Sequence, residues 1–458
     1  MKNMKVLSIL LIVFMLALTA CAGGGGGSKN NADDNGTTTE TPADDSGSNV
    51  AEEEPPADEP PAMDLGGRTI RMAAWWDLKP AGNTAGEKAA LEKYAELEKK
   101  YNFKFEFLNV PWDEYWDKFT TTVLAGEPFA DVLIYELKRA IVPIQQGQML
   151  PLSEFTKPTS DINNEQRLAK PLPAIGGVDY GFTTPGVSVV GLHYNRDLFK
   201  KLGLPDLQEL YNNGEWTWEK FMDVAKLATR DTDNDGKLDT YGFAGWPADV
   251  ARHFAAANGV SFVNPDTLED MSNDPRMIEA LEFVNRLFNV ENVTKVKTGN
   301  KMDWNESNTF KDGDVAMFIT YDWNIGDLTF EPGVVPVPLG PSGDPKFTHA
   351  RPDLNGWFIP KGVKDPQVVY QIFEEMRDLP PTEEYMGQDW LESRYKTEED
   401  IKMALEHING TGLVAIEESV PEYPFYTIMD EIIVQNKSVT AAVEGNKQKA
   451  EAAVAGIK

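Results

Sequence analysis

The chain has 458 residues, of which 73 are Asp or Glu and 43 are Lys or Arg, so its formal net charge is −30 at pH 7. A nucleic acid must be met by clusters of Lys and Arg, and the sequence contains none, which argues against a nucleic-acid partner and favours neutral or cationic ligands. Cys21 is the only cysteine, which excludes an intrachain disulfide and a thiolate metal site in the rest of the chain.

The N-terminus is typical of an exported protein. Two lysines precede an apolar run over residues 6–16, which is shorter than the roughly 20 residues that a membrane span needs. The run ends in Leu-Thr-Ala-Cys, which resembles the lipobox of bacterial lipoproteins. We therefore predict a signal peptide over residues 1–20 and a lipid anchor (palmitate) on Cys21, which would hold the protein on the outer face of the cell membrane. The alternative is a chance cysteine after a plain secretory signal.

Residues 21–64 are rich in Gly, Ser, Thr, Pro, Asp and Glu and almost free of large apolar side chains. Such a segment cannot bury enough surface to offset its ordering entropy, so we predict a disordered acidic tether. The remaining body is long enough for two lobes at about 100 to 200 residues per domain.

Strand and helix patterns alternate along this body. Residues 68–76 form a short β-branched and apolar run, residues 90–101 place apolar side chains at helical spacing, and Phe103, Phe105 and Phe107 alternate as in a strand. A buried strand is predicted at residues 130–135. The pattern indicates an α/β architecture built from β-α-β units.

Later helices follow the same rules. Apolar residues recur at helical spacing over 277–288, and Asp365 followed by Pro366 is typical of a helix start, with Asp365 as the N-cap and Pro366 in the first turn. No linker rich in Gly or Pro divides the chain after Pro61, so we expect two lobes that interleave. The predicted segments are lobe 1 at residues 65–180 and 315–375, lobe 2 at 181–314, and a C-terminal helical segment at 376–458 that belongs mainly to lobe 2.

Four stretches resemble a known family in order and spacing: GVDYGFTTPGVSVVGLHYNRDLFKKLGLPD, WTWEKFMDVAKLAT, FKDGDVAMFITYDWN and LNGWFIPKGVKDPQVVYQIFEEM. They are similar to the landmarks of extracellular solute-binding proteins of family 1, the lipid-anchored receptors of bacterial ABC importers for sugars and oligosaccharides. The resemblance covers about Arg68 to Met376. It implies a two-lobed periplasmic-binding-protein-like fold with a hinge. It also implies a monomer that holds a sugar or oligosaccharide between its lobes and passes this ligand to the permease of an ABC importer.

Aromatic and polar side chains at strand ends are the predicted ligand contacts. A sugar presents C–H patches on its ring faces and hydroxyl groups at its edge, so its receptor needs flat aromatic surfaces beside carboxylates, amides or guanidinium groups. In open α/β sheets ligands lie beyond the carboxyl ends of strands. The candidates are Trp75, Trp76, Asp77, Tyr135, Glu136, Trp246, Tyr321, Asp322, Trp323, Asn324, Arg351 and Trp357.

Other tryptophans are predicted to pack rather than to bind. Trp216 and Trp218 flank Thr217, a predicted helix cap, and Trp112 and Trp116 share one helical face. His193 lies inside an apolar strand pattern, which favours a buried structural residue over a catalytic base.

The stretch DTDNDGKLDTYG follows the ligand order of a calcium loop. Positions one, three, five and nine are Asp231, Asp233, Asp235 and Asp239, and Lys237 at position seven offers its carbonyl. The closing bidentate Glu is absent, because position twelve is Gly242. We predict a structural Ca²⁺ site with a missing or replaced ligand. An Asp-rich turn that binds no ion is the alternative.

Two other classes of protein agree less well with the sequence. A secreted glycosidase would need two carboxylates about 5 to 10 Å apart, and the many acidic residues leave such a pair open. The sequence carries no G-x-S-x-G elbow, no H-E-x-x-H zinc motif and no phosphate-binding loop, so we predict a protein that is not an enzyme. An adhesion module would predict repeats, and none is present.

Overall fold

The computed structural model describes residues 63–155, 178, 180–182, 186–351 and 355–457. The predicted signal peptide, Cys21 and nearly all of the predicted tether lie outside the described residues. No helix within the described part of the chain is both long enough and apolar enough to cross a membrane.

Lobe 1 is built on a four-stranded sheet with the order β2-β1-β3-β9. β1 runs parallel to β2 and β3, and β9 pairs antiparallel with β3. The strands are β1 (Arg68–Ala74), β2 (Phe103–Asn109), β3 (Val132–Glu136) and β9 (Asn355–Phe358). The helices are α1 (Ala85–Tyr101), α2 (Trp112–Leu124), α3 (Leu137–Gln145) and α10 (Pro366–Arg377), with the short turn η2 (Leu152–Glu154).

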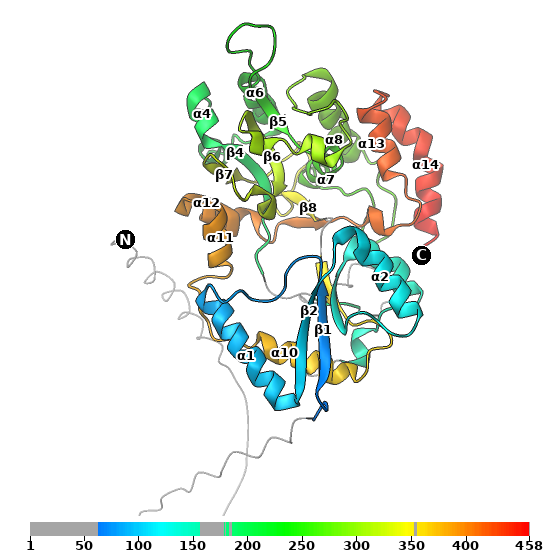
Figure 1. Cartoon of the computed structure of the whole chain (residues 1–458). Coiled ribbons are helices and arrows are strands. Elements are labelled where there is room, and N and C mark those ends of the chain that lie inside the picture. Colours follow the sequence, from blue (N-terminus) through cyan, green and yellow to red (C-terminus); the bar gives the residue numbers. More distant parts are fainter. Residues whose placement is uncertain (1–62, 156–177, 179, 183–185, 352–354, 458) are drawn as a thin grey trace, which may run out of the picture. The chain divides into compact units, whose positions relative to one another are not determined.

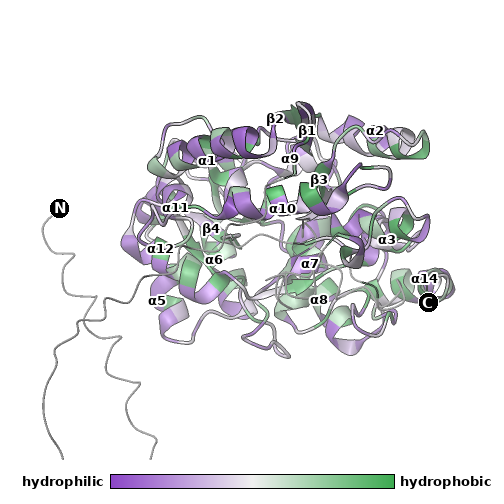
Figure 2. Ribbon diagram, turned by 90° about the horizontal axis from the view of Figure 1, so that it is seen from below, coloured by the Kyte–Doolittle hydropathy of each residue, from purple (hydrophilic) through white to green (hydrophobic). Residues whose placement is uncertain are grey.

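Local sequence accounts for the start and end of α1. Thr84 accepts a hydrogen bond from the backbone N–H of Glu87, whose side chain in turn accepts from Thr84, which completes a capping box. The helix ends at Asn102, whose φ of 49° lies in the left-handed region. Figure 2 shows hydrophilic and hydrophobic residues side by side along α1 and α10, as expected for helices that cover one face of a sheet.

Lobe 2 is built on a second four-stranded sheet, with the order β5-β6-β4-β7. Its strands are β4 (Val190–Asn195), β5 (Tyr241–Ala244), β6 (Val315–Tyr321) and β7 (Pro332–Val335). β5 runs parallel to β6, whereas β4 is antiparallel to both β6 and β7. All side chains of β4 and β6 are buried, which is the pattern of strands covered on both faces.

Helices from two parts of the chain surround this second sheet. The first group is α4 (Arg196–Leu202), α5 (Leu207–Asn212), α6 (Trp218–Ala228), α7 (Pro247–Ala257), α8 (Pro275–Asn285) with η4 (Arg286–Val290), α9 (Trp304–Ser307), η5 (Phe310–Asp312) and η6 (Asp322–Ile325). The second is α11 (Gln388–Arg394), α12 (Glu398–Met403) with η7 (Ala404–Ile408), η8 (Glu417–Ser419), α13 (Phe425–Ile433) and α14 (Val439–Ala455). The C-terminal segment therefore belongs mainly to lobe 2.

The lobes interleave, as predicted. The chain passes from η2 to β4, from β7 back to β9, and from α10 to α11, and a two-stranded parallel sheet of β8 (His349–Arg351) and β10 (Gly412–Val414) lies along these crossings. Figure 1 shows β1 and β2 grouped with α1, α2 and α10, and the strands of lobe 2 grouped with α4, α6, α7 and α8. The predicted α/β two-lobed architecture is confirmed.

The predicted start of the segment that returns to lobe 1 was wrong. Residues 315–375 were predicted to return to lobe 1, but β6 and β7 pair with β4 inside the lobe 2 sheet. The return to lobe 1 begins only with β9. The sequence of a buried strand does not reveal which sheet the strand joins, because the same apolar run fits either sheet.

Candidate functional site

Tryptophan side chains gather beyond the end of β1 in lobe 1. The Trp75 ring contacts Trp76, Tyr115 and Trp116 with centroid distances of 5.0, 5.4 and 5.4 Å, so Trp75 is half-buried. Trp76 is 40% exposed. The exposed Asp77 accepts a hydrogen bond from the backbone of Lys79 at 3.1 Å. The predicted strand-end cluster thus has one indole that faces solvent and one that supports it.

Trp112 and Trp116 extend this cluster from α2. Trp116 packs against Tyr135, with ring centroids 5.0 Å apart, as the packing prediction requires. Trp112 also packs on Trp116, with ring centroids 5.8 Å apart, but 43% of Trp112 is exposed. The guanidinium carbon of Arg139 lies 4.8 Å from the ring centroids of both Trp112 and Trp116. Spacing along the helix could indicate that the two indoles share a face, but not that the first turn of α2 leaves one of them uncovered.

Tyr135 and Glu136, two predicted hydroxyl binders, are buried at the end of β3. Burial raises the pKa of the Tyr135 phenol. Glu136 accepts a hydrogen bond from Arg139 Nε at 2.9 Å. Both side chains therefore form the inner layer behind the exposed indoles.

The second cluster follows β6 in lobe 2. Trp323 stacks on Tyr321 with centroids 5.2 Å apart and ring planes 15° apart, and 51% of Trp323 is exposed. Asp322 is buried and accepts hydrogen bonds from the backbone N–H of Val189 at 3.2 Å and from Trp390 Nε1 at 3.0 Å. Burial raises the pKa of the Asp322 carboxyl, although its hydrogen bonds oppose the shift. Trp323 presents an accessible platform, whereas the buried Asp322 holds the indole of Trp390.

Asn324 and Trp246 are less accessible than the prediction implied. Asn324 is buried, and its side-chain amide donates a hydrogen bond to Thr320 Oγ1 at 2.9 Å inside lobe 2. Trp246 is half-buried, donates from Nε1 to the carbonyl of Met302 at 2.9 Å, and lies beside Tyr426 with ring centroids 5.9 Å apart. The exposed Tyr426 therefore adds an aromatic surface that the sequence analysis missed.

Trp390 is a second aromatic residue that was missed. It is 38% exposed at the start of α11, its Nε1 is held by Asp322, and the guanidinium of Arg394 lies 4.1 Å from its ring centroid. No local pattern singles it out, because it follows no strand. Only the contact with Asp322, across 68 positions of sequence, brings it to the second cluster.

Charged residues join the two lobes. Lys138 Nζ lies 3.8 Å from Glu136 Oε1 and 3.6 Å from Glu418 Oε2. Glu418 accepts hydrogen bonds from the Tyr426 hydroxyl at 2.9 Å and from Arg252. Burial would raise the pKa of Glu418, but the charges of Arg252 and Lys138 outweigh it, and the pKa is lowered. This junction links the indoles of lobe 1 to the Trp246 and Tyr426 pair of lobe 2.

The junction continues below the surface. Ser419 donates a hydrogen bond to the carbonyl of Leu137 at 2.6 Å. Arg252, whose side chain is almost wholly buried, pairs with Asp249 at 2.8 Å and Glu417 at 2.5 Å as well as with Glu418. His253, the next residue, lies 6.1 Å from Tyr321 between ring centroids, so the second cluster adjoins the same helix α7.

One predicted residue, Trp357, lies apart from these clusters. Trp357 packs on Phe373 of α10 at 5.0 Å and lines an open cavity of about 410 Å³ with Tyr94 and Phe107. Its neighbour Phe358 is the one that turns toward Tyr135, since successive side chains of a strand point to opposite faces. Arg351 is half-buried in β8. The structure does not bring Trp357 to the strand-end indoles.

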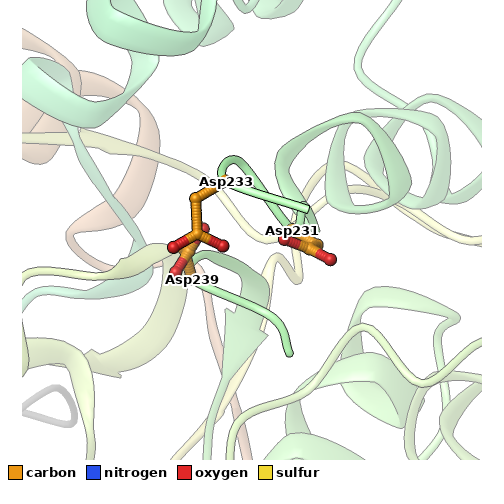
Figure 3. Close-up of side chains that lie close together, drawn as sticks. All are labelled: Asp231, Asp233 and Asp239. Atoms are coloured by element: carbon orange, nitrogen blue, oxygen red, sulfur yellow. The ribbon is translucent and has the colours of Figure 1, made fainter. Parts of the chain in front are cut away.

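The predicted calcium loop brings three carboxylates together. Oxygen atoms of Asp231, Asp233 and Asp239 all lie within 4.8 Å of one another (Figure 3). Asp235 does not belong to this group, and its carboxylate accepts a hydrogen bond from the backbone of Lys237 at 2.8 Å. Hydrogen bonds from Thr232 lower the pKa of Asp239.

The missing closing ligand of this loop has a steric cause. A Cβ atom at Gly242 would lie 2.1 Å from the carbonyl oxygen of Ala225 in α6. No side chain fits at that position, so the twelfth residue of the loop cannot be Glu while β5 approaches α6 this closely.

Comparison with known proteins places these features in a family. The structure is similar to an ABC substrate-binding protein of Listeria monocytogenes in complex with cycloalternan (18% identity, 85% of this chain and 98% of that chain, TM-score 0.58). It is also similar to the GacH receptor of Streptomyces glaucescens, studied with acarbose (17% identity, 86% of this chain and 100% of that chain, TM-score 0.58). A third similar structure is the maltotriose-bound MalE domain of Bdellovibrio bacteriovorus (16% identity, 85% of this chain and 99% of that chain, TM-score 0.55).

At these identities the likeness shows the fold, and no curated protein matches the sequence. The family model described as bacterial extracellular solute-binding protein matches residues 81–377, which is more than half of the chain. The chain belongs to the family of bacterial extracellular solute-binding proteins.

Proposed function

We propose that the protein captures a sugar or oligosaccharide between its two lobes outside the cytoplasm and delivers it to the permease of an ABC importer. The observation that carries the proposal is the presence of exposed tryptophans on both lobes, which the ion pair of Lys138 and Glu418 joins. Three structures of similar fold were solved with cycloalternan, acarbose or maltotriose.

The chemistry of the second cluster suits a carbohydrate. One face of the Trp323 indole rests on Tyr321, and half of the side chain is open to solvent, so a sugar ring can stack on it without moving the protein. Trp390 and Tyr426 add amphipathic surfaces that combine an apolar ring with a hydrogen-bonding edge. A pair of lobes joined by crossing segments can close over such a ligand by bending at those segments.

The proposal is tested by calorimetric titration of the protein with neutral oligosaccharides. We expect saturable binding, and we expect Trp323→Ala to weaken it roughly 10- to 100-fold, because an exposed aromatic anchor carries a large share of binding energy. Leu227→Ala, an exposed apolar change on α6, is the control and should leave the affinity unchanged.

Chromatography of the same mixtures separates a receptor from an enzyme. Intact oligosaccharide after prolonged incubation supports a receptor, whereas shorter products would support the alternative of a glycosidase with a carboxylate pair. Equal affinity of Trp323→Ala and the unchanged protein would contradict the assigned platform.

We also propose that Cys21 carries the lipid that anchors the protein to the membrane, and that the protein acts as a monomer. The Leu-Thr-Ala-Cys sequence after a short apolar run supports the anchor, and an extracellular family agrees with this location. An acidic segment of some 40 residues after the cysteine is long enough to hold the lobes away from the bilayer.

We further propose a structural Ca²⁺ ion at Asp231, Asp233 and Asp239. In roughly 10 mM Ca²⁺, a site with a Kd of about 10⁻⁴ to 10⁻³ M should raise the melting temperature of chelator-stripped protein by about 2 to 5 °C. Asp233→Ala should abolish the rise, and Asp266→Ala, a turn residue elsewhere, should keep it. The same melting temperature with and without Ca²⁺ would favour a turn that binds no ion.

A further inference from the structure

Arg139 is a cation held in a corner made by two indoles. Its guanidinium carbon is 4.8 Å from the ring centroids of both Trp112 and Trp116, whose ring planes meet at 83°. Contacts of this kind with tryptophan attract a guanidinium and fix its plane. Arg139 therefore has little of the rotational freedom of an ordinary surface arginine.

Within the described part of the chain, the terminal nitrogens of this guanidinium remain available. Among the described residues only Glu136 accepts a hydrogen bond from Arg139, through Nε at 2.9 Å, so Nη1 and Nη2 are not used within the described part of the protein. The side chain is 34% exposed. A planar fork with unused donors, held in place by its neighbours, is suited to bind two acceptor oxygens of a ligand at once.

The position of Arg139 ties it to the junction between the lobes. The neighbouring Lys138 contacts Glu418 of the segment that reaches lobe 2, and Trp116 contacts the predicted platform residue Trp75. The cations Arg139 and Lys138 lie beside the carboxylates Glu136 and Glu418, and Glu418 is shared with Arg252, which also pairs with Asp249 and Glu417. The three cations of this network are met by four carboxylates. The absence of any excess positive charge among these seven groups favours a neutral ligand over an anionic one.

We infer that Arg139 is a specificity-determining residue of the sugar site, whose Nη atoms donate hydrogen bonds to two adjacent hydroxyl oxygens of a neutral pyranose. This inference depends on the proposed function, because it assigns a contact to the same ligand. Trp112 then acts both as the support of the guanidinium and as an exposed edge of the site. No local sequence pattern predicts the residue, which faces the indoles only in the folded lobe.

The test measures the affinity of the full-length protein for maltotriose, mannotriose and trigalacturonate. We expect a neutral trisaccharide to bind. Arg139→Gln should weaken that binding roughly 10- to 100-fold, the loss expected when hydrogen bonds from a charged donor are removed. Arg139→Lys should also weaken it, at least about fivefold, because a point charge cannot replace the fork. The melting temperature of Arg139→Lys should stay within about 2 °C of the unchanged protein.

Arg286→Gln is the matched control. Arg286 also lies over an aromatic ring, Phe283 at 5.9 Å, and beside a glutamate, Glu291 at 3.7 Å, but it lies at the end of α8 in lobe 2. Its substitution should leave the affinity unchanged. Binding by Arg139→Gln within about twofold of the unchanged protein, full affinity in Arg139→Lys, or tighter binding of trigalacturonate than of the neutral sugars would each overturn the inference. If the unchanged protein binds none of the three, the proposed function itself fails.

Discussion

Replacing Arg252 with Met is expected to lower the free energy of unfolding by about 3 to 5 kcal/mol. Arg252 is the shared partner of Asp249, Glu417 and Glu418, and its own side chain is almost wholly buried. Without the guanidinium these carboxylates would lose their main counter-charge at a site where water cannot replace it. Urea denaturation at neutral pH, followed by tryptophan fluorescence, measures the change.

Two further variants show whether unpaired carboxylates cause the loss. Arg286→Met removes an arginine at the end of α8 and should change stability by less than about 0.5 kcal/mol. Adding Glu417→Gln to Arg252→Met should recover part of the loss, because one buried charge no longer needs a partner. A loss below about 1 kcal/mol for Arg252→Met would show that water reaches these carboxylates.

The protein should be less stable at pH 5.0 than at pH 7.5. Burial lowers the pKa of His193 and of His253 to about 3, and it also lowers the pKa of His349. An unfolded histidine binds a proton below about pH 6.5, whereas folded His193 and His253 stay neutral until about pH 3, so acid favours unfolding within this window. His193 and His253 should each contribute about 2 kcal/mol to the loss at pH 5.0, and almost nothing at pH 7.5.

His193→Gln isolates one of these contributions. The Nε2 atom of His193 lies 3.0 Å from the Tyr395 hydroxyl, a contact that an amide can retain without titrating. Urea denaturation at both pH values should show that this variant loses about 2 kcal/mol less than the unchanged protein. His407→Gln, a change on the half-buried turn η7, should not alter the difference. If His193→Gln shows the full acid loss, His193 takes up its proton in the folded state.

Sequence patterns predicted the features that depend on near neighbours. The alternation of Phe103, Phe105 and Phe107 predicted β2, and Thr217 caps α6 by accepting from the backbone of Lys220. Trp216 and Trp218, predicted to pack, are buried and donate to carbonyls of residues 336 and 338. Such features follow from spacing along one element, which the sequence displays directly.

Features that depend on distant neighbours were not predicted. Asp365 was expected to cap α10, but its carboxylate pairs with Arg68 at 3.2 Å and makes no cap. Asp322 was expected to face a ligand, yet it is buried beneath Trp390, and β6 joined the other sheet. Charge and aromatic content alone do not distinguish a side chain that supports a site from one that touches a ligand.

Strand β9 has a consequence for how the chain matures during export. The lobe 1 sheet lacks its outermost strand until residues 355–358 have emerged, more than 200 positions after β3, the strand with which β9 pairs. Pairing across so long a stretch is slow, because a large loop must close before any contact forms. In a partly translocated chain, one edge of β3 would remain unpaired, so lobe 1 can complete its fold only late. A chain truncated before β9 would expose this unpaired, aggregation-prone strand edge instead of forming a folded lobe.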